Sequence, residues 1–348
     1  MREYEVQRGH ICFFSCFADI MKYNGINVSE EMILGLSTGI NFNVYYNNDN
    51  NIKIECSDIY DNAFEIKRCL SLFGFKLDCH ILHDTKEFMI LIKKNLENDQ
   101  PVMVSIDVFY LEYHIDYQKA HAGHDIVVYY IDNEKVYIAD GYITTLHGSI
   151  YKGFILLEDF IKAIQLGEVI GENIQSLHTI CKKSNMDYLR KSTLYKIMKD
   201  NILDFIGSTN KSKSFVENMK KLKDYISPIN EEDLQLSNII YNLNQIGIMI
   251  NGLAGPVATR LLYSKFLRWG KSVCSIDIPE TVIDEYTDLS GLWKVVGNLL
   301  FKISKTREIN IKDRVLTRLN TIEKIETDLA RKLCELDYGI DCEIYIKS

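Results

Sequence analysis

The spacing of apolar and polar residues divides the chain into a mixed first part and a helical second part. In residues 13–24 apolar side chains recur at helical spacing until Gly25 ends the pattern, which predicts a helix. Ser29 is a suitable N-cap for a short second helix. Residues 61–74 and 86–97 show the same amphipathic period, so we expect helices there as well.

Strand signals lie between and after these helices. Residues 75–82 and 101–106 are short apolar runs typical of strands. Residues 124–141 hold two β-rich runs on either side of residues 132–134, which predicts a hairpin with a tight turn. From about residue 157 onward, helical periodicity dominates to the end of the sequence.

The order of these elements predicts an α+β fold: a leading helix plus an antiparallel sheet, followed by a mostly helical second domain. The chain has 348 residues, and at roughly 100–200 residues per domain two domains are expected. We place them at residues 1–165 and 166–348, where the pattern changes. An apolar content of 47% is ample for globular cores.

Charge and hydropathy exclude several classes of protein. The net charge of −8 argues against general nucleic-acid binding. The best candidate for a membrane span, residues 246–262, is interrupted by Asn251, Pro256 and Arg260, so we expect no membrane partner. The first residues, MREYEVQRGH, lack the apolar core of a secretory signal, and nine irregularly spaced cysteines suit reduced thiols. We therefore expect a cytoplasmic protein.

Two cysteines lie four residues apart where the first helix is predicted to begin. The plainest interpretation of each is core packing, because free cysteine is among the most buried residue types. A helix N-terminus, however, favours the thiolate, which makes Cys12 a candidate nucleophile. Cys16 lies one turn further on and is predicted to point into the core. A zinc site built from Cys12, Cys16, His121 and His124 is an alternative that the spacing disfavours, since structural zinc sites prefer CxxC.

A cysteine nucleophile needs a histidine base and a group that orients the histidine. His124 opens the first strand of the predicted hairpin and Asp140 ends the second strand. Antiparallel pairing around a tight turn brings the start of one strand close to the end of the other. Taken singly, these residues fit a surface histidine and a turn-forming aspartate. Together with Cys12 they form a candidate catalytic triad.

These segments resemble a known family. CFFSCFADIMKYNG resembles the opening helix of papain-like cysteine enzymes of the leader-processing peptidase type, and HDIVVYYIDNEKVYIAD resembles their strand–turn–strand segment from the His to the Asp. NVSEEMILGLSTGINF, PVMVSIDVFYLEY and AGHDIVVYYIDNEKVYIAD together resemble the N-terminal domain of the butirosin-biosynthesis acyltransferase family and, within it, the amide-forming enzymes of closthioamide biosynthesis. The resemblance covers about residues 5–165, and a weaker one covers residues 252–270.

The resemblance implies a papain-like catalytic domain that moves an acyl group from a carrier-protein thioester to an amine. It implies that Cys12 is the nucleophile, His124 the base and Asp140 the orienting residue. Gln7 is the candidate oxyanion-hole donor, although it lies one position closer to the cysteine than is usual. The implied partners are an acyl or peptidyl carrier protein and a small or carrier-bound amine. The resemblance implies no resident cofactor, because phosphopantetheine arrives on the carrier protein.

Other candidate site residues carry less specific signals. Asp107, Tyr110 and Tyr113 follow a predicted buried strand and either line an acyl groove or are ordinary loop residues. Arg260 interrupts an apolar stretch and either binds a phosphate or carboxylate or forms an internal salt bridge. Residues 182–223 hold eleven Lys and Arg against four Asp and Glu. Such a run is usually a solvated helix face, but it also suits an acidic carrier protein.

The sequence leaves three classes of function open. In a carrier-dependent acyltransferase an amine resolves the acyl-enzyme, whereas in a peptidase or amidase with the same triad water resolves it. The third class is a non-catalytic carrier-binding protein, against which the intact Cys, His and Asp set argues. Two features favour transfer: there is no transporter or secretion segment, and there is a large helical second domain suited to excluding water.

Overall fold

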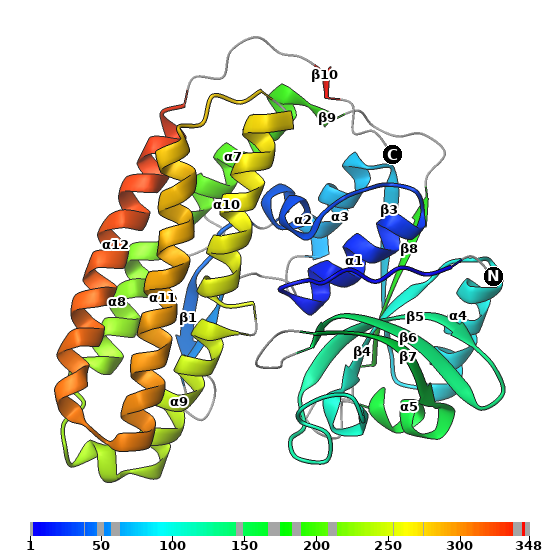
Figure 1. Ribbon diagram of the computed structural model, residues 1–348, viewed down its shortest axis with the longest axis horizontal. Helices are drawn as coiled ribbons and strands as arrows, with labels where there is room; N and C mark the ends of the chain where they lie inside the picture. The colour runs from blue at the N-terminus through cyan, green and yellow to red at the C-terminus, as the bar shows by residue number, and fades with distance from the viewer. Residues whose placement is uncertain are drawn as a thin grey trace. The chain divides into compact units, whose positions relative to one another are not determined.

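The structure is a computed structural model in which two compact units can be distinguished by their internal contacts (Figure 1). Unit 1 comprises Met1–Ile33, Ala63–Tyr188 and Tyr345–Ser348, and unit 2 comprises Leu34–Asn62 and Leu189–Ile344. The division into domains at residue 165 stays a prediction. The structure describes residues 3–37, 39–46, 52–56, 63–143, 149–165, 175–182, 189–207, 214–252, 254–273, 275–336 and 343–344.

Unit 1 contains both helices and strands, and α2 extends into unit 2. They are α1 (Cys12–Tyr23), α2 (Glu30–Leu36), α3 (Ala63–Leu72), β3 (Phe75–Leu82), α4 (Thr85–Glu97), β4 (Val102–Asp107), the 3-10 turn η1 (Val108–Tyr110), β5 (Gly123–Ile131), β6 (Lys135–Ile143), β7 (Ser149–Leu156), α5 (Leu157–Ala163) and β8 (Gln175–Lys182).

The six strands of unit 1 form one antiparallel sheet in the order β3-β8-β4-β5-β6-β7. On one face, strand residues such as Ile126 and Val128 pack against Phe88 of α4 and Phe160 of α5 in a common apolar core. Helix α1 lies on the other face, where it contacts β5 and β6 (Figure 1). Helices on both faces explain why β4 is an almost continuous apolar run rather than an alternating one.

Helix α1 is a mostly apolar helix that is buried on all sides, since every residue from 13 to 21 is buried. Phe14, Phe17 and Ile20 are completely buried. The helix ends at Tyr23, and Gly25 adopts a φ of 84°, a left-handed conformation that glycine reaches without steric cost. The helix therefore begins and ends one residue earlier than the periodicity predicts.

The β5–β6 hairpin is closed by Asp132. Its carboxylate accepts hydrogen bonds from the backbone N–H groups of Glu134 at 2.9 Å and Lys135 at 2.7 Å. The strands then pair so that Val127 lies opposite Ala139. This register places the start of β5 beside the end of β6, as the sequence predicts.

Unit 2 is mostly helical, which together with unit 1 confirms the predicted α+β class. Its two-stranded hairpin from residues 43–55 packs against helices α8 and α9, and α11 packs against α9, α10 and α12. The elements are β1 (Asn43–Tyr46), β2 (Ile52–Glu55), β9 (Leu189–Arg190), α7 (Lys191–Phe205), α8 (Phe215–Ile226), η2 (Asp233–Gln235), α9 (Ser237–Asn251), α10 (Pro256–Val273), α11 (Glu280–Thr306), η3 (Ile309–Ile311), α12 (Lys312–Cys334) and β10 (Glu343–Ile344).

An ion pair lies at the centre of unit 2. Arg260 and Glu326 are completely buried and form a bidentate pair, with Nε at 3.1 Å from Oε1 and Nη2 at 2.8 Å from Oε2. Trp293 Nε1 donates to the same carboxylate at 2.7 Å, and Arg260 also donates to the carbonyl of Asn41. Arg260 therefore makes the internal salt bridge that the sequence left open as the alternative to a ligand site.

One helical stretch of the described residues, Ser237–Val273, is long and apolar enough to cross a membrane by length and composition. It consists of α9 and α10, and Pro256 begins the second of these helices. The buried Arg260 lies within this stretch. Of the 18 most apolar consecutive residues of the stretch, 53% are buried inside the protein.

We predict that Glu326→Gln lowers the free energy of unfolding of unit 2 by about 3–5 kcal/mol, because it leaves the Arg260 charge buried without a counter-ion. Urea denaturation followed by tryptophan fluorescence measures this, since both tryptophans of the chain, Trp269 and Trp293, lie in unit 2. The control is Glu285→Gln, which breaks a more exposed pair with Lys332 and should cost at most about 1 kcal/mol. Equal effects of the two changes would contradict the prediction.

Candidate active site

Cys12 is the first residue of α1, and its side chain is half-buried. The residue before it, Ile11, provides no side-chain cap for the helix. The N–H groups of the first turn and the helix dipole therefore favour negative charge at this end. The location suits a reactive thiol.

The segment that leads into Cys12 is fixed by two sets of hydrogen bonds. The carboxylate of Glu30 accepts from the backbone N–H of His10 at 2.9 Å and of Ile11 at 2.5 Å. The N–H of Gly9 donates to the carbonyl of Gly141 at 2.7 Å. A Cβ atom on Gly141 would lie 2.6 Å from the carbonyl oxygen of residue 7, so this approach requires glycine.

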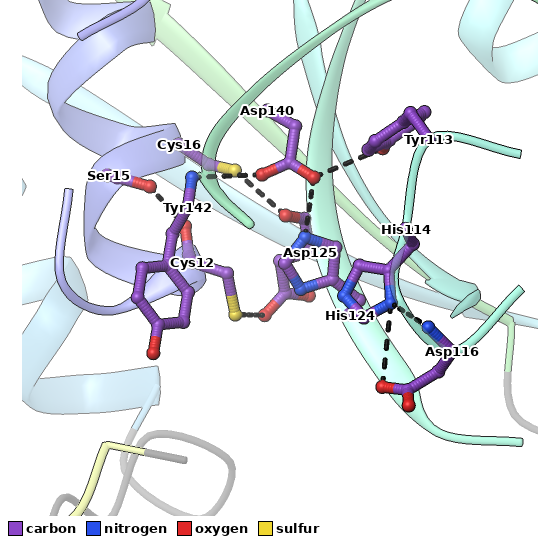
Figure 2. Close-up of polar contacts among 10 residues, drawn as sticks. All are labelled: Cys12, Ser15, Cys16, Tyr113, His114, Asp116, His124, Asp125, Asp140 and Tyr142. Carbon is purple, nitrogen blue, oxygen red and sulfur yellow. Dashed lines mark hydrogen bonds and ion pairs between the residues drawn. The ribbon is translucent and has the colours of Figure 1, made fainter. Parts of the chain in front are cut away.

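His124 and Asp140 meet at the end of the sheet, as Figure 2 shows. Nε2 of His124 lies 2.7 Å from Oδ2 of Asp140, and both side chains are buried. The same carboxylate accepts from the hydroxyl of Tyr113 at 3.1 Å and from the N–H of Tyr142 at 2.9 Å. Three donors therefore hold the Asp140 side chain in place.

The ring of His124 also acts on the thiol of Cys12, whose pKa it lowers. Because Nε2 faces Asp140, Nδ1 is the nitrogen available to the sulfur. Burial alone would lower the pKa of the imidazole, but the adjacent Asp140 carboxylate, its hydrogen bond to the ring and the nearby Cys12 raise it well above 6.5. The structure thus brings the three predicted triad residues together, and their catalytic roles stay a prediction.

A fourth titratable group, Asp125, touches the sulfur (Figure 2). Its side chain is buried, and the thiol of Cys12 donates to its Oδ2 at 3.7 Å. The hydroxyl of Ser105 donates to Oδ1 at 2.5 Å. Burial raises the pKa of the Cys12 thiol, the negative charge of Asp125 raises it further, and His124 opposes both effects. Sequence reasoning missed Asp125; the available signal was a charged residue inside the apolar strand pattern HDIVVYYI.

Cys16 lies in the core, where its thiol donates to the backbone carbonyl of Asp125 at 3.4 Å. Burial raises the pKa of this thiol well above its ordinary value. Within the part of the chain that the structure describes, no group of three or more His, Cys, Asp or Glu side chains is arranged to hold a metal ion. Of the four residues considered for zinc, His121 instead pairs with Asp107 through Nδ1 at 2.6 Å.

The remaining candidate residues have varied surroundings. Asp107 is buried at the end of β4 and accepts from the N–H groups of Phe109 and Ala122, so it fixes the loop that leads to β5. Tyr110 packs against the apolar core of the sheet. Tyr113 stacks on Tyr151 with ring centroids 3.9 Å apart.

Gln7, the candidate oxyanion donor, is exposed. Its backbone N–H donates to Asp19 at 3.1 Å. Among the residues with described positions, no hydrogen bond links the Gln7 side chain to Cys12. Its role in an oxyanion hole stays a prediction.

His114 is a further residue that sequence reasoning missed. Its ring centroid lies 5.5 Å from that of His124, and its side chain is buried. Nδ1 of His114 accepts from the N–H of Asp116 at 3.2 Å. Burial lowers the pKa of His114, and the charge on His124 lowers it further. His114 therefore adds an uncharged ring rather than a second cation beside the site.

A comparison with known families agrees with the resemblance drawn from the sequence. Residues 12–141 match the family described as butirosin biosynthesis protein H, N-terminal. The matched segment begins at Cys12 and ends one residue after Asp140, so it contains Cys12, His124 and Asp140. The predicted family is thereby confirmed for this part of the chain. No curated protein matches the chain.

We predict that Asp140→Asn lowers the pKa of His124, because removal of the carboxylate charge takes away the main stabilisation of the imidazolium. Titration of the histidine ring protons by NMR measures this shift, with His124→Gln used for assignment. In the unchanged protein the ring should stay protonated well above pH 6.5. Asp78→Asn, which alters a partly exposed carboxylate paired with Lys76, should leave the titration in place.

We also predict that Cys16→Ala lowers the free energy of unfolding by roughly 1–2 kcal/mol, whereas Cys12→Ala changes it by less than about 0.5 kcal/mol. The reason is that Cys16 is buried and Cys12 is half-buried. Urea denaturation followed by far-ultraviolet circular dichroism gives both values. A larger loss for Cys12→Ala would show that this thiol is the one that supports the core.

Proposed function

Because residues 12–141 match the family described as butirosin biosynthesis protein H, N-terminal, we propose that the protein is a cysteine-dependent acyltransferase of natural-product biosynthesis. It takes an acyl group from a thioester on an acyl or peptidyl carrier protein and joins it to an amine, forming an amide. The observation that carries the proposal is that Cys12 lies at the N-terminus of α1 near His124, whose ring pairs with Asp140 at 2.7 Å.

In the acylation step the neutral form of His124 takes the thiol proton of Cys12 at Nδ1, and the sulfur attacks the thioester carbonyl carbon. The backbone N–H of Cys12, with Gln7 as the candidate second donor, stabilises the oxyanion that forms. The tetrahedral intermediate then breaks the bond to the phosphopantetheine sulfur. That sulfur takes the proton from His124 and leaves as a thiol.

In the second step an amine attacks the carbonyl carbon of the acyl-enzyme and gives a proton to His124. The carbon–sulfur bond to Cys12 breaks, and the proton returns to the sulfur. One thioester and one amine are thus converted into one amide and one thiol, so neither step needs a resident cofactor. We place this reaction in the cytoplasm.

Asp140 has the supporting role in both steps. Its carboxylate fixes the orientation of the His124 ring and stabilises the imidazolium that forms each time a proton is taken. Tyr113 and the N–H of Tyr142 hold that carboxylate in turn, so Tyr113 belongs to the support of the triad. A groove-lining role for Asp107, Tyr110 and Tyr113 stays part of the proposal.

The basic segment, residues 182–223, is our candidate docking surface for an acidic carrier protein. Several of its lysines bond within unit 2: Lys191 donates to the carbonyl of Ser275, Lys221 donates to the carbonyl of Val44, and Lys223 pairs with Glu323 at 2.6 Å. Lys196 and Lys220 are exposed. They are therefore the better positions for charge reversal. Residues 183–188 and 208–213 of the segment lie outside the described residues.

We predict that a panel of acyl thioesters, each loaded on a carrier protein and on N-acetylcysteamine, gives a covalent acyl adduct on Cys12. Intact-protein mass spectrometry with peptide mapping detects the adduct. Cys12→Ala should abolish it, and His124→Ala should slow its formation at least about 100-fold, since general base catalysis contributes that much. Cys16→Ala, which removes a core thiol, should keep it.

The fate of the adduct separates the alternatives. Discharge by an added amine in preference to water, with the amide as product, supports transfer. Discharge by water at the same rate whether or not amine is present indicates a peptidase or amidase. Carrier binding without any adduct across the panel indicates a non-catalytic carrier-binding protein.

A further inference from the structure

The buried carboxyl group of Asp125, which the proposed mechanism does not use, lies beside the sulfur of Cys12. Asp125 is 1% exposed, and its Oδ2 lies 3.7 Å from the sulfur of Cys12 (Figure 2). The hydroxyl of Ser105 in the neighbouring strand β4 donates to the other oxygen. A buried carboxyl group is expensive unless it is paired, so its retention beside a thiol calls for an explanation.

Two side chains act on the thiol of Cys12 in opposite directions. Oδ2 of Asp125 accepts its hydrogen bond, whereas His124 favours the thiolate. Loss of the thiol proton gives a thiolate beside the His124 imidazolium, which is favourable. The same thiolate then lies beside the Asp125 carboxylate, and two negative charges at this distance repel each other strongly in a buried site.

Other groups around the sulfur belong to four elements. They are Cys16 on α1, Ser105 on β4, His124 and Asp125 on β5, and Asp140 on β6. Asp140 acts on the sulfur through His124, which it keeps charged. Asp125 acts on the sulfur directly. The two carboxylates therefore have opposite effects on the thiol, one through its base and one through its own charge.

We propose that Asp125 is a positioning residue that holds Cys12 as a thiol in the free protein, by accepting the S–H hydrogen bond and opposing ionisation of the sulfur. The ionisation of the nucleophile is then set by competition between Asp125 and His124. The inference rests on the proposed function only in taking Cys12 as the nucleophile. Its consequence is a thiol that resists alkylation and oxidation when no substrate is bound, because the thiolate is the reactive form.

The role of Ser105 follows from the same contact. Burial raises the pKa of the Asp125 carboxyl group, whereas the hydrogen bond from Ser105 lowers it and so favours the charged form. Ser105 thus keeps available the negative charge that opposes ionisation of Cys12. The pair acts as one unit, in which Asp125 touches the sulfur and Ser105 touches Asp125.

The test is the pH dependence of Cys12 alkylation by iodoacetamide in the full chain, followed at the Cys12 peptide by mass spectrometry. Asp125→Asn keeps the shape of the side chain and an oxygen for the Ser105 hydroxyl but removes the charge. We expect it to move the midpoint of the rate profile to lower pH by about one unit. Below both midpoints this gives alkylation roughly three- to tenfold faster than in the unchanged protein, the lower figure because a more acidic thiol is less nucleophilic.

Two further variants frame this result. Ser105→Ala should shift the profile in the same direction by a smaller amount, because Asp125 is then more readily neutralised. Asp159→Asn makes the same chemical change on α5, which packs on the opposite face of the sheet, at a carboxylate paired with Lys162. It should leave the profile unchanged.

A profile that stays in place or moves to higher pH in Asp125→Asn would overturn the inference, because the carboxylate would then not oppose ionisation. If Asp125→Asn lacks a cooperative unfolding transition, Ser105→Ala decides by the same criterion. Failure of the proposed acyl-transfer function would not affect this test. Alkylation of the free protein measures the thiol alone and needs neither carrier nor amine.

Discussion

A single hydrogen bond, 2.7 Å from Nε2 of His124 to Oδ2 of Asp140, links the register of the sheet to the chemistry of the site. It exists because β5 and β6 pair with Val127 opposite Ala139, a register set by the turn around Asp132 and by a one-residue shift between Val128 and Tyr130. A slip of one residue would send the affected strand's side chains to the other face of the sheet and separate the ring from the carboxylate. The ring that we propose as the base for Cys12 is positioned by this pairing.

The site balances two carboxylates of opposite effect around one thiol and one imidazole. Asp140 stabilises positive charge on His124, and Asp125 disfavours negative charge on Cys12. Buried ionisable groups are strongly coupled, since little water is present to screen them. The reactivity of the sulfur is therefore a property of the four groups together, and a change at any one of them alters the proton distribution over the others.

Local elements could be predicted from the sequence, and long-range packing could not. Helix α1 and the β5–β6 hairpin were predictable because periodicity, Gly25 and the turn residues act over short stretches. Asp125 was missed because side chains alternate along β5, so Asp125 and His124 point to opposite faces of the strand. Cys12 comes close to both residues only when α1 packs on the sheet, and the sequence does not predict that packing. The surroundings of Arg260 depended on Glu326, which lies 66 residues away on a different helix. No periodic signal states which helices will pack together.

The close approach of Gly9 to Gly141 has a consequence for how sequences of this kind can vary. Gly141 follows Asp140 in β6, and its carbonyl accepts a hydrogen bond from the N–H of Gly9, three residues before Cys12. The two backbones are in direct contact here, with no room for a Cβ at residue 141. A methyl group at residue 141 would push the strand that carries Asp140 away from the segment that leads into Cys12. Substitutions at residue 141 would therefore change the distance between Asp140 and Cys12. Their effect on activity, compared with their effect on stability, would report how strongly the proposed reaction depends on that distance.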